Sequence, residues 1–296
     1  MTVTPVPSIP PKPIIKDRSI LFEGGRTGVL LIHGLGGTPL EMKSLGRRLV
    51  DTGATVLCCQ LAGHCGTEKQ LIETRWQDWQ ASAEAALSRL AERCDTILVG
   101  GLSMGAVLAA RLAAEEPRRV QGLIMLAPTL WYDGWSIPWY SFLLRMFISW
   151  PFVKRYRFVE REPYGLKDER VRAVVASAMM SGDSAAAGLV ATPAPALKEM
   201  WRLVDAVKPQ LPSVRQPTLL VHAREDDIAG LSNAHFLQRK LGGLVETLIL
   251  DDSYHLVTVD RQRGVMMESA ARFVSRVGGL EAEKPSRRAA GRLHAV

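Results

Sequence analysis

The stretch "VGGLSMGAVLAARL" occupies positions 99–112, where an apolar run meets an Ala-rich run at a serine between two glycines. The first run predicts a buried strand, and the second predicts a helix. Gly101 and Gly105 indicate a strained turn in which neighbouring backbone comes too close to admit a Cβ atom. A G-x-S-x-G turn between a strand and a helix lifts its serine out of the sheet, so Ser103 is a candidate nucleophile.

Buried strands alternate with helices on both sides of this turn. Strands are expected over 27–34, 54–61, 96–102, 120–128, 217–223 and 245–251, and helices over 38–53, 76–94, 104–116, 231–242 and 260–277. Strands that return to the same edge of a sheet through a helix pair in parallel. The sequence therefore predicts an α/β fold with an open, mostly parallel sheet flanked by helices, built from residues 20–128 and 213–279.

The alternation is interrupted by residues 129–212, which contain no clear buried strand and are expected to form an inserted helical cap. Within it, "WYSFLLRMFISW" (139–150) is apolar apart from Ser141, Arg145 and Ser149. A helix of this length measures about 18 Å, too short to cross a bilayer core of roughly 30 Å. We expect it to cover an apolar acyl pocket, and peripheral contact of the cap with a membrane surface is the alternative. A second helix is expected over 167–182, and 181–195 is small and flexible enough to act as a hinge.

Composition excludes several classes of protein. The formal charge of +7 is concentrated at the two chain ends, and no dense basic stripe indicates nucleic-acid binding. The four cysteines lack CxxC spacing, so a disulfide framework and a zinc site are disfavoured and a cytoplasmic location is expected. Residues 1–19 are Pro-rich without an apolar signal core and read as a disordered or extended lead-in, and residues 280–296 read as a flexible tail.

A serine nucleophile needs a base and an acid, which in open parallel sheets lie at the carboxyl ends of strands. Among the six histidines, only His255 falls on a loop beyond the last strand. Of the others, His33 and His64 are expected in loops, His222 in a strand, His235 on a helix and His294 in the tail. The acid that orients the imidazole is expected in "AREDDIAG", which offers Glu225, Asp226 and Asp227.

Negative charge that develops on the substrate oxygen needs preorganised N–H donors. The residue after the nucleophile, Met104, supplies one backbone N–H group. The loop after the first strong strand, "HGLGG", is expected to supply the other from Leu35.

The runs "LLIHGLGGTPLEMKSLGRRL", "LAGHCGT", "GLSMG", "HAREDDIAG" and "DDSYHLVTVDRQR" together resemble the α/β-hydrolase superfamily over about residues 20–277. Within it the chain looks most like bacterial carboxylesterases and monoacylglycerol lipases. The resemblance implies Ser103 as nucleophile, Asp226 as acid and His255 as base, with Leu35 and Met104 as oxyanion donors. It favours Asp226 because the family places its acid in G/A-x-x-D, followed two residues later by Val or Ile. Two departures are the Gly63-His64-Cys65 run in place of Gly-His-Gly, and Tyr254 in place of the common glycine before the histidine.

These residues predict a serine hydrolase that cleaves carboxylic esters of short to medium acyl chains, monoacylglycerols among them, through an acyl-enzyme intermediate. A thioesterase or lysophospholipase would use the same triad, because fold and triad do not determine the leaving group. A non-catalytic binding protein on this scaffold is disfavoured because no triad member is missing. The expected partner is a small acyl ester, with no metal and no organic cofactor, and the sequence does not indicate an oligomeric state.

Overall fold

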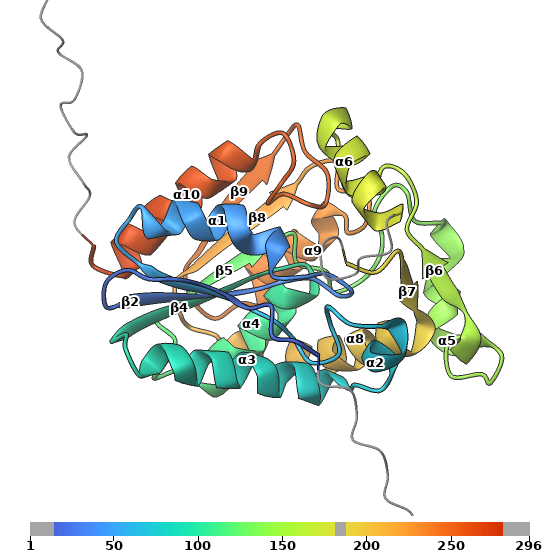
Figure 1. The fold of residues 1–296 in the computed structure, drawn as a ribbon, viewed down its shortest axis with the longest axis horizontal. Coiled ribbons are helices and arrows are strands. Elements are labelled where there is room, and N and C mark those ends of the chain that lie inside the picture. Colours follow the sequence, from blue (N-terminus) through green and yellow to red (C-terminus); the bar gives the residue numbers. More distant parts are fainter. Residues whose placement is uncertain (1–14, 181–187, 281–296) are drawn as a thin grey trace, which may run out of the picture.

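The central sheet runs through the whole molecule in the computed structural model, which describes residues 15–180 and 188–280 (Figure 1). Its strand order is β1-β3-β2-β4-β5-β8-β9. The strands are β1 (Ile20–Phe22), β2 (Thr27–Ile32), β3 (Thr55–Cys59), β4 (Thr96–Leu102), β5 (Gly122–Leu126), β8 (Thr218–Ala223) and β9 (Val245–Leu250). Every neighbouring pair from β3 to β9 is parallel, and only β1 pairs antiparallel, with β3. The predicted α/β fold with a mostly parallel sheet is confirmed.

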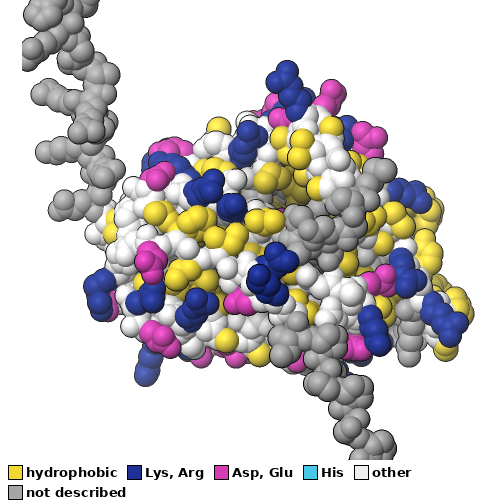
Figure 2. All heavy atoms as spheres, in the orientation of Figure 1, with side chains coloured by type: hydrophobic (Ala, Val, Ile, Leu, Met, Phe, Trp, Pro, Cys, Tyr) yellow, Lys and Arg dark blue, Asp and Glu magenta, His cyan; other side chains and the backbone are white. Residues whose placement is uncertain are grey.

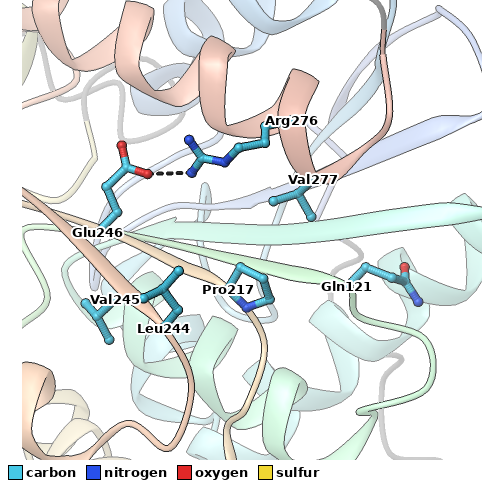
Figure 3. Close-up of a pocket in the computed structure, with 7 residues that line it drawn as sticks. All are labelled: Gln121, Pro217, Leu244, Val245, Glu246, Arg276 and Val277. Atoms are coloured by element: carbon cyan, nitrogen blue, oxygen red, sulfur yellow. Dashed lines mark hydrogen bonds and ion pairs between the residues drawn. The ribbon is translucent and has the colours of Figure 1, made fainter.

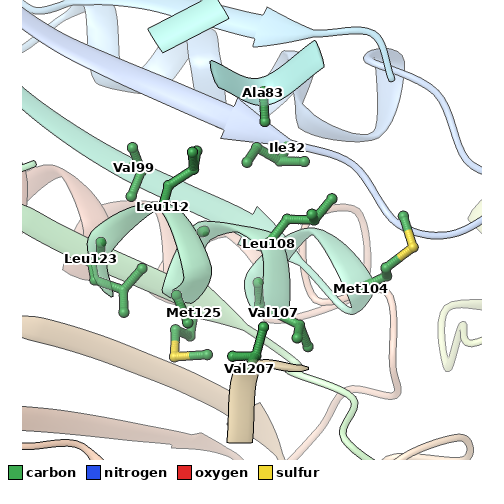
Figure 4. Packing of buried hydrophobic residues seen from close by; sticks show 14 of the residues in the cluster. Ile32, Ala83, Val99, Met104, Val107, Leu108, Leu112, Leu123, Met125 and Val207 are labelled. Atoms are coloured by element: carbon green, nitrogen blue, oxygen red, sulfur yellow. The ribbon is translucent and has the colours of Figure 1, made fainter. Parts of the chain in front are cut away.

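Helices cover both faces of the sheet, which explains why its strands read as continuous apolar runs. One face is covered by α1 (Leu40–Val50) and α10 (Arg263–Val277), and the other by α3 (Trp76–Ala91), α4 (Met104–Glu115), α8 (Ala194–Val207) and α9 (Leu231–Lys240). Successive strand residues alternate between the two cores, so Cys58 packs on the α1 side and Cys59 on the α3 side. Helix α4, which follows Ser103, is packed on all sides. Figure 4 shows its apolar side chains among those of β4, β5 and α8, including Val99, Leu123, Met125 and Val207.

Two short elements of the core were not predicted. Strand β1 is three residues long and lies at the sheet edge, and α2 (Glu68–Ile72) is a single capped turn and a half. Both are too short for a hydrophobic period to be visible in sequence. They do not change the arrangement of the strands that carry the predicted site.

Residues 129–212, which we call the cap, contain helices and a small sheet. Their elements are η1 (Trp139–Leu143), α5 (Leu144–Phe147), η2 (Val153–Arg155), β6 (Arg157–Val159), α6 (Glu169–Met180), β7 (Ala191–Pro193), α8 and η3 (Lys208–Ser213). The continuous helix expected over 139–150 is wrong in form: it begins as a 3-10 turn after Pro138 and is α-helical only over Leu144–Phe147. The antiparallel β6–β7 pair was not expected. Of the predicted hinge (181–195), residues 181–187 lie outside the described residues, and 191–195 form β7 and the start of α8.

Of the predicted lead-in (1–19) the structure describes only residues 15–19, which form no helix or strand, and of the predicted tail (280–296) it describes only residue 280. No helix in the described part of the chain is long and apolar enough to cross a membrane.

Candidate active site

Ser103 stands at the carboxyl end of β4, where the chain turns sharply into α4. Its φ of 55° and ψ of −115° are strained for a residue with a side chain. A Cβ atom on Gly101 would lie 2.2 Å from the carbonyl carbon of Gly105, and one on Gly105 would lie 2.2 Å from the carbonyl oxygen of Ile32. Only glycine fits on either side of the serine, as the sequence suggested, because backbone from the next turn and from β2 occupies that space.

The Ser103 hydroxyl lies against Thr129, the first residue of the cap. The two hydroxyl oxygens are 3.0 Å apart. Thr129 donates its own proton to the carbonyl oxygen of Ala127, over 3.3 Å, so it accepts the proton of Ser103. Within the described chain Ser103 forms no hydrogen bond with His255. Its side chain must therefore leave Thr129 before it can pass a proton to that imidazole.

His255 and Asp226 form a buried pair on the loops that follow β9 and β8. The His255 Nδ1 atom lies 2.8 Å from Oδ2 and 3.0 Å from Oδ1 of Asp226. Burial lowers the pKa of His255, but attraction by the Asp226 carboxylate and the hydrogen bond to it outweigh this, so the pKa lies above its usual value. Burial raises the pKa of Asp226, and the attraction of His255 more than offsets it, leaving the carboxyl ionised. The pair can therefore hold and stabilise an imidazolium.

Asp226 is oriented by its own loop. Its Oδ1 atom accepts the backbone N–H groups of Ile228, over 2.9 Å, and of Ala229, over 2.8 Å. Oδ2 is thereby left facing the imidazole of His255, the arrangement that holds a histidine in the tautomer with its proton on Nδ1. The side chain of His222 approaches the same oxygen at 3.5 Å, and its Nε2 donates to the carbonyl oxygen of Ala229.

Asp227, the alternative acid, has a different task. Its Oδ1 accepts the backbone N–H of His255 over 3.2 Å, and its Oδ2 accepts that of Gly165 over 3.1 Å. One buried carboxylate thus joins the loop of His255 to the cap. Sequence gave no signal for this role, since it depends on a residue 62 positions away.

Two further contacts fasten the cap to the same edge of the core. Asp260 accepts the backbone N–H groups of Lys167 and Asp168 from the cap and of Tyr254 from the loop before His255. On the other side, the Leu189 N–H donates to the carbonyl oxygen of Gly36 over 2.9 Å. The cap is therefore hydrogen-bonded both to the histidine loop and to the glycine loop after β2.

The glycine loop after β2 lies beside Ser103. A Cβ atom on Gly34 would lie 3.7 Å from the Cβ of Ser103. Within the described chain, the N–H groups of Leu35 and Met104 have no hydrogen-bond acceptor. The buried His33 braces the loop: its Nδ1 lies 2.8 Å from the Gly34 carbonyl oxygen, and its Nε2 accepts the Leu61 N–H. Two free N–H groups beside a serine can bind an oxyanion.

Two acidic side chains near His255 were not singled out from the sequence. Glu41, at the start of α1, accepts the Gly34 N–H over 3.2 Å, and its carboxyl group lies against the Gly37 backbone. Burial raises the pKa of Glu41 and of the cap residue Glu160 to about 7, against the opposing attraction of His255 on both. The site is therefore bordered by two carboxyl groups that resist ionisation.

The remaining described histidines do not fit the role of base. Burial lowers the pKa of His33 to about 3 and that of His64 to about 4, so both rings stay neutral. His222 is buried within β8, and burial also lowers its pKa. His235 lies exposed on α9, and His294 falls outside the described residues.

A hollow at the opposite edge of the sheet is unrelated to these residues. It lies at the amino ends of β5, β8 and β9, where Figure 3 shows an ion pair between Glu246 and Arg276. Among the described residues, no three His, Cys, Asp or Glu side chains are grouped as a metal site would require.

Relatives of this chain are ester-cleaving enzymes by name. It is 27% identical to the thermostable monoacylglycerol lipase of Bacillus sp. (strain H-257) over 258 residues, covering 87% of this chain and 94% of the relative. It is 22% identical to a carboxylesterase of Bacillus subtilis (strain 168) over 267 residues, covering 89% and 98%.

Solved structures show the same fold. A structure from a study of the metagenome-derived lipolytic enzymes LipS and LipT matches with a TM-score of 0.75 at 26% identity, covering 87% of this chain and 97% of that one. A soluble variant of monoglyceride lipase from Saccharomyces cerevisiae matches with a TM-score of 0.72 at 14% identity, covering 93% and 99%. The family model described as serine aminopeptidase, S33, matches residues 25–262. The chain belongs to this S33 family of α/β-hydrolases.

Proposed function

We propose that the protein is a serine esterase that hydrolyses carboxylic esters of short to medium acyl chains, monoacylglycerols among them. The observation that carries this proposal is the buried His255–Asp226 pair at the same sheet edge as the strained, glycine-flanked Ser103. The names of the two Bacillus relatives support esters as the substrate class.

The proposed reaction proceeds through an acyl-enzyme. Ser103 Oγ leaves Thr129 and attacks the ester carbonyl carbon, while its proton passes to Nε2 of His255. The carbon–oxygen bond to the alcohol then breaks, and the same proton moves from Nε2 to the departing oxygen. A water molecule attacks the acyl-enzyme, gives one proton to His255 and releases the acid, after which the imidazole returns a proton to Ser103. Asp226 stabilises the imidazolium in both halves.

The oxyanion formed in each half needs hydrogen-bond donors on the side of the carbonyl away from the leaving group. We assign the backbone N–H groups of Leu35 and Met104 to this role, supported by their lack of another acceptor within the described chain. One such donor contributes roughly 3–4 kcal/mol to the transition state. Met104 is the first residue of α4, so the positive end of that helix adds to the attraction.

The acidic surroundings favour a neutral alcohol as leaving group. Glu41, Glu160 and Asp227 border the site, and each of these carboxyl groups would repel a phosphate-bearing group to the extent that it is ionised. A glycerol or simple alcohol meets no such repulsion, and a carboxyl group with a pKa near 7 can donate to or accept from a hydroxyl. Acyl-CoA thioesters and lysophospholipids, which the same triad would cleave, are therefore the second choice.

A reducing compartment such as the cytoplasm suits the proposed enzyme. All four cysteines are unpaired thiols, and Cys58, Cys59 and Cys94 are buried in the core. Their removal from solvent indicates that Cys58 and Cys59 of β3, and Cys94 in the loop between α3 and β4, serve packing rather than a cross-link.

The test compares the purified chain with Ser103→Ala on matched panels. The panels are p-nitrophenyl esters of increasing acyl length, 1-monoacylglycerols, acyl-CoA thioesters, a lysophospholipid and an amino-acid p-nitroanilide. We expect covalent labelling by a fluorophosphonate and ester hydrolysis in the wild type, both lost in Ser103→Ala with an unchanged circular dichroism spectrum. Retained turnover in the alanine variant would refute the nucleophile assignment, and preference for the anilide or the thioester would refute the substrate class.

A further inference from the structure

The cap exposes an unusual amount of aromatic surface. Residues 135–161 hold nine of the 19 aromatic residues of the chain. Trp139 is 84% exposed, Met146 69% and Phe152 67%. We call the exposed set on and around η1, α5 and η2 the apolar patch, and it consists of Trp139, Tyr140, Phe142, Met146, Trp150, Phe152 and Tyr156.

Packing of the cap does not require these side chains. The same segment already buries an inner face, in which Leu144 and Ile148 pack with Leu197 and Trp201 of α8. An ion pair between Arg145 and Asp205 fastens it to α8 as well. The outward residues are therefore additional to what holds the cap on the core.

The patch is also large and ordered by its own contacts. Its six aromatic side chains expose on the order of 700 Å² of surface to water, taking about 200 Å² for a fully exposed aromatic side chain and the exposed fraction of each. The largest apolar patch on a typical monomer is about 300–600 Å² and is often functional. Edge-to-face contacts join Phe147 to Trp150, with ring centres 4.8 Å apart, and Trp150 to Phe152, with centres 5.3 Å apart. These rings thus present a preformed surface.

Positive charge accompanies the patch. Residues 135–161 carry five Lys or Arg residues against the single acidic residue Glu160. Two of the five pair with acids outside this segment, Arg145 with Asp205 and Arg157 with Glu68. Arg155 and Arg161 are exposed and form no ion pair with a residue that the structure describes. Figure 1 places α5 and β6 at the right-hand edge of the molecule, and the same edge in Figure 2 shows hydrophobic side chains beside Lys and Arg side chains.

We propose that the apolar patch, together with the exposed Arg155 at the end of η2 and Arg161 just after β6, docks the cap on an anionic lipid surface. Aromatic side chains insert at the level of the lipid headgroups, and arginines at their rim attract negatively charged headgroups. A second copy of this chain fits less well. A twofold dimer through the patch would bring two surfaces of the same positive charge together.

The experiment measures flotation of the full chain with vesicles of phosphatidylcholine alone and of phosphatidylcholine with 30% phosphatidylglycerol, at about 50 and 300 mM salt. We expect binding to the anionic vesicles that weakens with salt, because screening shortens the reach of the arginines. Ser103→Ala should float like the wild type, so this inference does not depend on the proposed hydrolysis.

Two pairs of variants separate the apolar and the charged contribution. Trp139→Ser with Phe142→Ser should weaken binding at least about tenfold at both salt concentrations. Arg155→Gln with Arg161→Gln should weaken it about 30-fold at low salt and much less at high salt. The matched controls are Leu244→Ser and Arg118→Gln with Arg215→Gln, which remove exposed residues of the core at the opposite edge. Every variant should hydrolyse a soluble short-chain ester at the wild-type rate.

Three results would overturn the proposal. The first is equal binding to neutral and anionic vesicles, or none to either. The second is a patch variant that floats as the wild type does. The third is a concentration-dependent dimer in sedimentation that becomes a monomer in Trp139→Ser with Phe142→Ser, which would identify the patch as a contact between copies of the chain.

Discussion

Replacing Asp226 by asparagine should disable His255 without disturbing the fold, for a reason visible in the loop itself. The Oδ1 position accepts two backbone N–H groups at 2.9 and 2.8 Å, so the amide oxygen of the asparagine must occupy it. The amide NH2 group then takes the place of Oδ2, 2.8 Å from Nδ1 of His255. Because that group donates, Nδ1 must accept, and the imidazole carries its proton on Nε2. An Nε2–H group cannot take the proton of Ser103.

The expected loss in kcat is about 10⁴-fold, equivalent to about 5 kcal/mol of transition-state stabilisation. Stability should change little, since the volume and both backbone hydrogen bonds are retained. The assay is steady-state hydrolysis of p-nitrophenyl butyrate at pH 8, together with the Tm of each protein.

Asp227→Asn is the matched control on the neighbouring residue. Its two oxygens accept the N–H groups of His255 and Gly165, so in either orientation an amide NH2 group faces another donor. The free energy of unfolding should fall by about 1–3 kcal/mol, equivalent to about 2–5 °C in Tm, while kcat falls less than about tenfold. The reasoning would be contradicted if Asp226→Asn kept a tenth of the wild-type kcat while Asp227→Asn was inactive. Asp227 would then be the acid that orients His255, and Asp226 the carboxylate with a structural role.

Three further outcomes test the electrostatics and the packing of the site. The raised pKa of His255 should place the acid limb of the pH profile of kcat/KM above 6.5, because only the neutral imidazole acts as base. Glu160 has a pKa of about 7, and its ionised form raises the pKa of His255, so Glu160→Gln should move this limb to lower pH. Glu41 has a pKa of about 7 in the folded protein against an ordinary 4.5, so the native state loses stability as the pH rises from about 4.5 to about 7. In urea unfolding, Glu41→Gln should be as stable as the wild type near pH 4 and more stable by about 2–3 kcal/mol at pH 8. Equal stability of the two proteins at both pH values would show that burial does not oppose the charge of Glu41. Gly105→Ala places a Cβ atom 2.2 Å from the carbonyl oxygen of Ile32 at the end of β2, and should lower the free energy of unfolding by about 3 kcal/mol or more. Gly264→Ala, whose Cβ atom would have no neighbour within 4 Å, should be tolerated. Similar Tm values for the two variants would show that the turn at Ser103 has space for a side chain.

Much of this protein could be predicted from sequence because the signals are local. A continuous apolar run of six residues indicates a strand covered on both faces wherever it occurs, and glycines around Ser103 indicate a turn too tight for side chains. The same reasoning failed for residues 139–150, where apolar residues on every side concealed a short 3-10 turn and a surface exposed to solvent. Hydrophobicity alone does not distinguish a side chain buried by a neighbour from one left uncovered.

The order of strands and helices, and the presence of a serine, acids and a histidine at strand ends, follow from local sequence patterns. Tertiary structure decided which of these meet: Asp226 bonds to His255 across 29 residues, while Asp227 reaches Gly165 across 62 and Ser103 reaches Thr129 across 26. It also places the partly buried Glu41 beside the glycine loop, where its pKa is raised and its charge is suppressed. The physical reason is the distance along the chain over which each kind of interaction acts. Backbone preferences act over a few residues, whereas hydrogen-bond partners and burial depend on how distant segments pack.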